Sequence, residues 1–130
     1  MHNFVNEPVN GVVTFVHDGT YEGLLCAIDE ALQTAASAEL VADDQWQPSL
    51  LGDAQQVPAD AARAHAFLQR LTQAGGHAVA QVVSYCFLAE EPAAVRVLAE
   101  YCRLAFARGP AVVKYHAHAA VHAVQAAAQR

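Results

Sequence analysis

The hydrophobic pattern predicts a short strand followed by a first helix. Residues 12–16 are valine, threonine and phenylalanine, the β-branched and aromatic composition typical of strands. Residues 17–19, His-Asp-Gly, end this run with a turn signal. Thr20 suits the position before a helix, because its hydroxyl can accept hydrogen bonds from exposed backbone N–H groups. Leucine, isoleucine and alanine recur at helical spacing from residue 21 to about residue 36, which predicts a helix there.

Residues 38–58 break the periodicity and are predicted to form a loop. Aspartate, proline and glycine are spread through this stretch, as is usual where the chain turns. It also contains Trp46, Leu50 and Leu51, so we expect the loop to be pinned onto the core. A lone strand leaves its backbone groups unpaired, and residues 55–57 are therefore predicted as its partner.

From residue 60 onward the pattern is helical. Asp60 suits the cap of a helix over 61–74, and two glycines end that helix. The next segment, 77–89, is apolar around much of its circumference and is predicted to be central. A helix over 92–108 opens on a proline and stops at Gly-Pro, and a last helix runs from 111 onward. The predicted fold is mainly α: a bundle of about five helices with a short β element, strand 12–16 and its partner near 55–57.

Composition narrows the class of protein. The 130 residues are 55% hydrophobic and 15% charged, which excludes a disordered chain. The net charge of -6 excludes a broad basic surface for nucleic acid, and no apolar run reaches the roughly 18 residues that span a bilayer. The N-terminus lacks a secretion-signal pattern. Three cysteines without a CxxC pair favour a reducing cytoplasm over a disulfide scaffold.

Two histidines are the candidate metal ligands. His118 and His122 are four residues apart, so on one continuous helix they share a face, and two imidazoles at that spacing can bind zinc. A metal site needs a third ligand, but neither aspartate nor glutamate follows Pro110 and the HExxH motif is absent. The alternative interpretation is a polar stripe facing solvent together with Lys114 and Gln125. We expect no metal and no other cofactor.

No catalytic residue is expected in this chain. Cys26, Cys86 and Cys102 each fall on an apolar helical stripe, where thiols are usually buried structural groups. Motifs that cradle phosphate, GxxxxGK[ST] and GxGxxG, are absent. The carboxylates near the first predicted helix are explained by the favourable effect of negative charge at a helix N-terminus. They do not indicate a catalytic acid–base pair.

Four basic residues near the C-terminal end are the candidate contacts to nucleic acid. Arg96 and Arg103 are seven residues apart, about two helical turns, and can share a face. Arg108 and Lys114 follow within the next eleven positions. Affinity for DNA depends largely on neutralised phosphates, so these four residues predict at most a small patch.

Three segments resemble a bacterial family of DNA-repair or DNA-metabolism proteins. Thr14 to Ala31 matches the family's opening: an apolar strand, a turn reading His/Tyr-Asp-Gly-Thr/Ser-aromatic-Glu-Gly, then Leu-Leu-x-Ala. Residues 47–51, Gln-Pro-Ser-Leu-Leu, resemble a later segment, and so do residues 87–91 followed by 101–103. Order and spacing agree over about residues 12–115. The motif positions that carry over are Asp18, Gly19, Tyr21, Gly23, Pro48, Tyr101 and Arg103.

The resemblance implies a role beside a catalytic partner. Members are usually encoded next to a radical-SAM protein that resembles spore photoproduct lyase, and some are joined to a domain like a uracil-DNA glycosylase. Members also continue into Glu-x-His-Arg and Gly-Phe-x-Arg-Phe stretches, which this sequence does not reach. Residues 1–130 are therefore expected to be one helical domain, the N-terminal portion of a longer family domain. We expect it to dock a radical-SAM or glycosylase partner, to meet DNA indirectly and to contribute little chemistry.

Two other functions stay open on the sequence. The last predicted helix has an alanine and valine face that suits packing on a second copy, which predicts a stand-alone interaction module that forms a homodimer. A metal-dependent enzyme that uses His118 and His122 is the other alternative.

Overall fold

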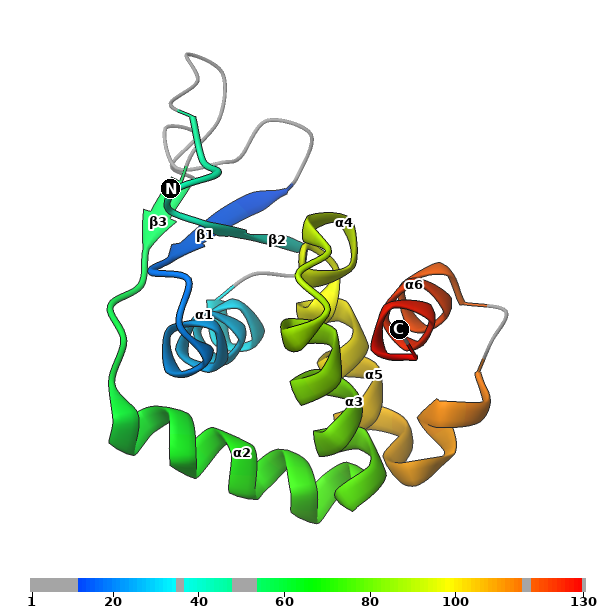
Figure 1. Cartoon of the computed structure of the whole chain (residues 1–130). Coiled ribbons are helices and arrows are strands. Elements are labelled where there is room, and N and C mark those ends of the chain that lie inside the picture. Colours follow the sequence, from blue (N-terminus) through cyan, green and yellow to red (C-terminus); the bar gives the residue numbers. More distant parts are fainter. Residues whose placement is uncertain (1–11, 35–36, 48–53, 116–117, 130) are drawn as a thin grey trace, which may run out of the picture.

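The computed structural model describes residues 12–34, 37–47, 54–115 and 118–129, and this part of the chain is mainly α-helical, as predicted. A small sheet lies over the first helix, and the other helices pack below and beside it (Figure 1). In chain order the elements are β1 (Val13–His17), α1 (Tyr21–Thr34), β2 (Ala38–Ala42), β3 (Ala54–Gln56), α2 (Ala61–Gly75), α3 (His77–Leu88), α4 (Pro92–Val95), α5 (Leu98–Arg108), the 3-10 helix η3 (Gly109–Lys114) and α6 (Ala119–Ala128).

The sheet has three parallel strands in the order β2-β1-β3. Phe15 in the central strand lies opposite Leu40 of β2 and Gln55 of β3. The partner predicted near 55–57 is confirmed as β3. Because the strands are parallel, their carboxyl ends lie at one edge of the sheet, and this edge bounds the cavity described below.

The predicted loop over 38–58 is wrong at its beginning, where β2 forms. Ala38–Ala42 buries only Leu40 fully and has no strand pattern of its own. The segment becomes a strand because β1 supplies a parallel partner and because the Leu40 N–H donates to the Arg96 carbonyl at 3.3 Å. Trp46 is half-buried, whereas Leu50 and Leu51 lie outside the described residues.

The most enclosed helix is α1, not α3 as the sequence predicts. Every residue from Gly23 to Asp29 is buried, because α1 packs against β1, β2, α2 and α5. In α3, by contrast, Tyr85 is 49% exposed and Leu88 is 68% exposed. The apolar circumference of α3 therefore includes a face that the fold leaves open to solvent.

Several helix ends follow their predicted signals. The Thr20 hydroxyl accepts from the Gly23 N–H at 3.0 Å at the start of α1. Asp60 caps α2 by accepting from the N–H groups of Ala62 and Arg63. Gly76 follows α2 with a φ of 89°, a conformation that favours glycine.

The last two predicted helices are each interrupted. The helix predicted over 92–108 is wrong as one piece: α4 ends at Val95 and α5 begins at Leu98, so that the Arg96 carbonyl can pair with β2. The helix predicted from 111 is also wrong. Residues 109–114 form η3, and α6 begins only at Ala119, with His118 as its cap.

The apolar face of α6 packs inside the molecule. Ala120, Val121, Val124 and Ala127 are buried, and α6 lies chiefly against α3. The face that predicts a homodimer is therefore covered by the chain's own core. Among the described helices, none combines the length and the hydropathy that a membrane crossing requires.

Candidate functional site

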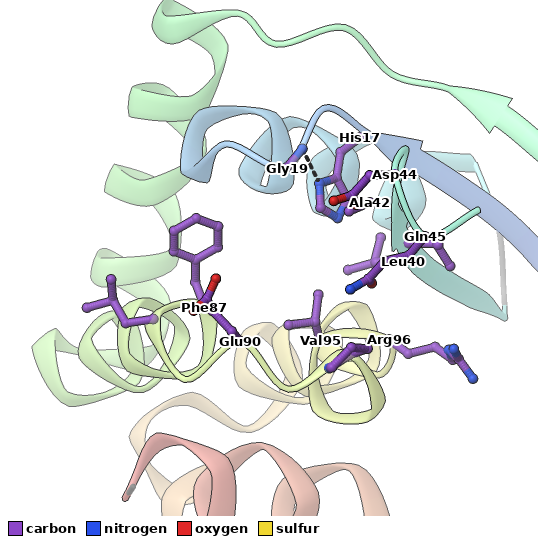
Figure 2. A pocket seen from close by; sticks show the side chains of 13 residues that line it. His17, Gly19, Leu40, Ala42, Asp44, Gln45, Phe87, Glu90, Val95 and Arg96 are labelled. Atoms are coloured by element: carbon purple, nitrogen blue, oxygen red, sulfur yellow. Dashed lines mark hydrogen bonds between the residues drawn. The ribbon is translucent and has the colours of Figure 1, made fainter.

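A cavity of about 320 Å³ lies between the carboxyl edge of the sheet and the link from α3 to α4 (Figure 2). This size is at the lower end of the roughly 300–1,000 Å³ typical of small-molecule sites. The carboxyl ends of parallel strands are where open α/β sheets bind ligands. The sheet side of the cavity consists of His17, Gly19, Leu40, Val41, Ala42, Asp44 and Gln45. The helical side consists of Phe87, Leu88, Glu90, Pro92, Val95 and Arg96.

His17, the last residue of β1, is the buried polar group of this cavity. It is 4% exposed, and its Nδ1 accepts from the Gly19 N–H at 3.1 Å. A neutral imidazole that accepts at Nδ1 carries its proton on Nε2, so Nε2 is a donor. Nε2 is buried and has no hydrogen-bond partner among the described residues. Figure 2 shows the ring on the sheet side, facing Phe87 and Val95 across the cavity.

The charge of His17 is set by opposing effects. Desolvation by burial is the largest of them and lowers the pKa of the imidazole. Asp18, Asp43 and Asp44 act in the opposite direction, but the net pKa lies below the ordinary value of 6.5. His17 is therefore neutral at neutral pH and offers an N–H donor rather than a positive charge.

The turn after β1 holds His17 in place. The Asp18 carboxylate accepts from the Thr20 N–H at 2.9 Å and from the Thr20 hydroxyl at 2.6 Å. A Cβ at position 23 would overlap Asp18 Oδ1, so any other residue there would displace the Asp18 carboxylate from its bonds to Thr20. Gly19 has a φ of 87°, which also favours glycine. The motif residues Asp18, Gly19 and Gly23 thus have a structural reason in this turn.

The segment that contains Phe87 packs directly against the segment that contains Tyr21. The rings of Tyr21 and Phe87 are 5.2 Å apart between centroids, and the Tyr21 hydroxyl is 2.7 Å from Ser84 Oγ. Residues 14–31 and 87–91, which are far apart in the sequence, therefore meet at one site. Pro48, a further motif position, lies outside the described residues.

Glu90 lies on the cavity wall in a strained conformation. Its φ is 54°, in the left-handed region that non-glycine residues rarely adopt. The Glu90 N–H donates to the Phe87 carbonyl at 3.2 Å, which closes the end of α3. Glycine is the usual residue at such a helix end, so glutamate there costs roughly 1–2 kcal/mol.

Two acidic side chains and one basic side chain line the cavity. Asp44 and Glu90 lie on opposite walls, and Arg96 lies at the α4–α5 junction. Arg96 Nε is 3.5 Å from a carboxylate oxygen of Glu39, so part of its charge is already balanced. The lining therefore offers no excess positive charge to an anion.

The four predicted nucleic-acid contacts do not form one patch. Arg96 lines the cavity before α5 begins, whereas Arg108 is the last residue of α5 and Lys114 is the last residue of η3. Arg103 pairs with Glu100 at 3.6 Å, and the Arg108 guanidinium lies 4.3 Å from the centroid of the Tyr115 ring. Contact with nucleic acid stays a prediction for these residues.

An ion cluster between α1 and α2 was not predicted. Asp29 is 5% exposed, and its carboxylate accepts from Arg63 at 2.7 Å, from Arg70 at 2.8 Å and from Gln33 at 3.0 Å. Burial alone raises the pKa of this carboxyl, but the hydrogen bonds and charges of the two arginines outweigh it and lower the net pKa. The cluster joins two helices and uses two of the chain's few cations.

The predicted structural role of the cysteines agrees with their burial. All three are buried free thiols. Burial raises the pKa of Cys86 to about 11 and that of Cys102 to about 12. Thiols with such pKa values are weak nucleophiles at neutral pH. Tyr101, a motif residue, is fully buried in the same core, and burial raises its pKa to about 12.

The predicted histidine pair is not on one continuous helix. His118 is the cap of α6, and its Nδ1 accepts from the Ala120 N–H at 3.2 Å. Its Nε2 lies 3.8 Å from Glu100, and His122 is exposed on α6. Within residues 12–34, 37–47, 54–115 and 118–129, no group of three metal-ligating side chains is placed to hold an ion.

The sequence pattern places His17 in a turn and does not indicate Glu90 or Asp44 as site residues. A titratable residue that ends a buried strand before an Asp-Gly turn is the signal that could have identified His17. Comparison with known proteins adds no assignment: no family model, curated protein or solved structure matches the chain.

Proposed function

We propose that this protein is an accessory protein of bacterial DNA repair or DNA metabolism that docks a catalytic partner. The partner class is a radical-SAM protein or a DNA glycosylase, and DNA is met through that partner. The observation that supports this proposal most is the convergence of two segments, 14–31 and 87–91, which resemble the same family and meet at one cavity. A reducing cytoplasm fits the three buried thiols.

The outer face of α3 is the proposed docking surface. Tyr85 and Leu88 are three residues apart, so their side chains leave the helix on the same side. They are 49% and 68% exposed, an unusual degree for large apolar side chains. Leu88 also lines the cavity, which places this surface beside the converging motifs. Aromatic side chains in particular often anchor protein interfaces.

Several of the described reactive groups have structural roles, which favours docking over catalysis. The Asp29 carboxylate binds two arginines, and His118 caps a helix. The buried thiols Cys86 and Cys102 have raised pKa values. No observation favours the homodimer or the metal-dependent enzyme. The apolar face of α6 is buried inside the molecule, and His118 caps α6 whereas His122 lies within that helix.

The test measures binding to a purified radical-SAM protein encoded by the neighbouring gene. We expect a complex that Leu88→Asp weakens by about ten-fold or more, since a charge there would be desolvated at the interface. Tyr115→Asp is the matched control, because Tyr115 is also a partly exposed aromatic residue, at 38%. It follows η3, and η3 begins near the first turn of α3, where Gly76 approaches Pro110, whereas Leu88 is the last residue of α3. Thermal melts check that both variants fold.

Two results would contradict the proposal. One is the absence of a complex with either partner class at high micromolar concentration. The other is an equal loss of binding in Leu88→Asp and Tyr115→Asp, which would place the contact away from α3.

A further inference from the structure

We propose that the cavity receives an apolar side chain of the docked partner, and that lysine or arginine residues flank this side chain in the partner's sequence. The inference rests on the proposed docking function and deepens it, because it names the chemistry of the partner segment. The cavity adjoins the docking surface, since Leu88 lines the cavity and is exposed at the end of α3. A partner that covers the outer face of α3 therefore also reaches the mouth of the cavity.

The best-buried part of the cavity lining is apolar. Leu40 is 1% exposed, and Phe87 and Val95 are partly buried against the hydrophobic core. Figure 2 shows Leu40 on the sheet side and the other two on the helical side. A side chain that enters from solvent is removed from water against these residues, as anchoring side chains are in protein interfaces. The volume of about 320 Å³ has room for one large apolar side chain.

The exposed part of the lining is charged, and most of its charge is negative. Asp44, Glu90 and Arg96 carry the formal charges of the described lining, and all three are exposed. Arg96 Nε lies 3.5 Å from a carboxylate oxygen of Glu39, which balances part of its charge. Asp44 on the sheet side and Glu90 on the α3–α4 link therefore leave the mouth of the cavity acidic.

Further carboxylates lie near this mouth. Asp18 and Asp43 act together with Asp44 on the His17 imidazole, so all three lie at the carboxyl edge of the sheet. The Asp43 N–H also donates to the His17 carbonyl at 2.7 Å, which fixes the start of the turn after β2. Negative charges gathered beside an apolar cavity attract a basic segment and repel an acidic one.

The apolar interior and the acidic mouth together specify the partner segment. A lone lysine or arginine would bring its charge against the apolar interior and lose hydration there. An apolar residue between basic residues suits both parts, because the anchor enters the cavity while its neighbours stay in water near Asp44 and Glu90. Separate basic residues can approach the two walls, so no single group has to bridge them.

The first experiment titrates the full chain with the capped peptide Lys-Lys-Phe-Lys-Lys and follows backbone amide shifts by NMR. We expect saturable shifts at residues 17–19, 40–45 and 87–96. The peptide Lys-Lys-Ser-Lys-Lys lacks the anchor and should bind about ten-fold more weakly. The peptide Glu-Glu-Phe-Glu-Glu reverses the flanking charge and should show no saturable binding. Equal affinity of the first peptide and either of the others, or saturable shifts confined to other regions, would overturn the inference.

Two glutamate substitutions separate the cavity mouth from the net charge of the protein. Glu90→Gln removes a carboxylate of the lining, and we expect about two- to five-fold weaker binding of Lys-Lys-Phe-Lys-Lys, the range for an exposed ion pair. Glu30→Gln makes the same change at the α1–α2 junction, outside the lining, and should leave the affinity unchanged. Asp44→Asn combined with Glu90→Gln should weaken binding about ten-fold. Equal affinity in Glu90→Gln and Glu30→Gln would contradict a role of the acidic mouth.

Binding of the partner protein distinguishes this inference from the docking proposal. A complex that Leu88→Asp weakens but the Asp44→Asn, Glu90→Gln double variant does not would overturn the inference and leave docking in place. Saturable binding of Lys-Lys-Phe-Lys-Lys in the cavity, without a complex with either partner class, would contradict docking to those partners and support the preference of the site for an anchored basic segment.

Discussion

At the scale of single residues, the end of β1 shows how a short motif positions one imidazole. Gly19 supplies the N–H that occupies Nδ1, and Gly23 leaves room for the Asp18 carboxylate. The result is a neutral histidine with a buried donor beside a cavity. Each residue of the motif therefore acts on the conformation of the turn.

Burial of His17 makes stability depend on mild acid. Its folded pKa lies below the ordinary 6.5, so between these two values the unfolded chain binds a proton that the folded chain does not. The free energy of unfolding is therefore highest above about pH 6.5 and falls as the pH drops through the folded pKa. Urea denaturation at a series of pH values should show this decline, and His17→Asn should flatten it; an identical decline in the variant would refute the assignment.

Replacing Glu90 by glycine is expected to stabilise the protein, because Glu90 has a strained backbone conformation. Glu90→Gly relieves a φ of 54° and should raise the free energy of unfolding by about 1 kcal/mol. Ala89→Gly is the matched control, because Ala89 has an ordinary φ of -71° and gains nothing from glycine. Chemical denaturation measures both variants, and a loss of stability in Glu90→Gly would mean that its side chain contributes more than the strain costs.

At the scale of elements, helices with terminal signals could be predicted and elements made by distant partners could not. Asp60 and Gly76 bound α2 through local hydrogen bonds and backbone conformation. β2 contains alanine and glutamate, which are poor strand residues, and forms because β1 lies beside it. The break between α4 and α5 likewise depends on a hydrogen bond from Leu40 to Arg96.

Removing the charge of the buried Asp29 carboxylate between α1 and α2 is expected to lower the stability of the protein strongly. Asp29→Asn removes the charge that two arginines share and should cost about 2 kcal/mol of unfolding free energy. Glu30→Gln is the matched control, with one bond to Arg63 from a more exposed side chain, and should cost about 1 kcal/mol or less. Equal costs would show that burial does not govern this cluster.

The same cluster has a pH signature. The folded pKa of Asp29 lies below the ordinary 3.8, so its stabilising effect is complete above that value and is lost as the pH falls through the folded pKa. Acid titration followed by circular dichroism should show that Asp29→Asn loses this part of the acid dependence.

At the scale of the whole molecule, the candidate site could be predicted only in part. The resemblance identified residues 14–31 and 87–91, but their meeting at one cavity depends on the fold. Asp44 reaches the site because the turn after β2 is held by the bond from the Asp43 N–H to the His17 carbonyl at 2.7 Å. Such long-range placement has no periodic signal in the sequence.

The charge distribution predicts weak affinity for DNA by this chain alone. The net charge is -6, and within the described residues four of six basic side chains are in ion pairs: Arg63, Arg70, Arg96 and Arg103. Fluorescence anisotropy with a labelled duplex should show no saturable binding at physiological salt. Tight binding with a steep salt dependence, lost in Arg108→Ala, would instead show a basic surface at the end of α5.

The most direct test of the account is hydrogen–deuterium exchange of the chain alone and in complex with the proposed radical-SAM or glycosylase partner. Docking beside the converging motifs predicts slower exchange in residues 84–91 and in the turn over 17–23. Protection confined to residues 103–115, or unchanged exchange throughout, would contradict the claim that this protein works through the α3 surface.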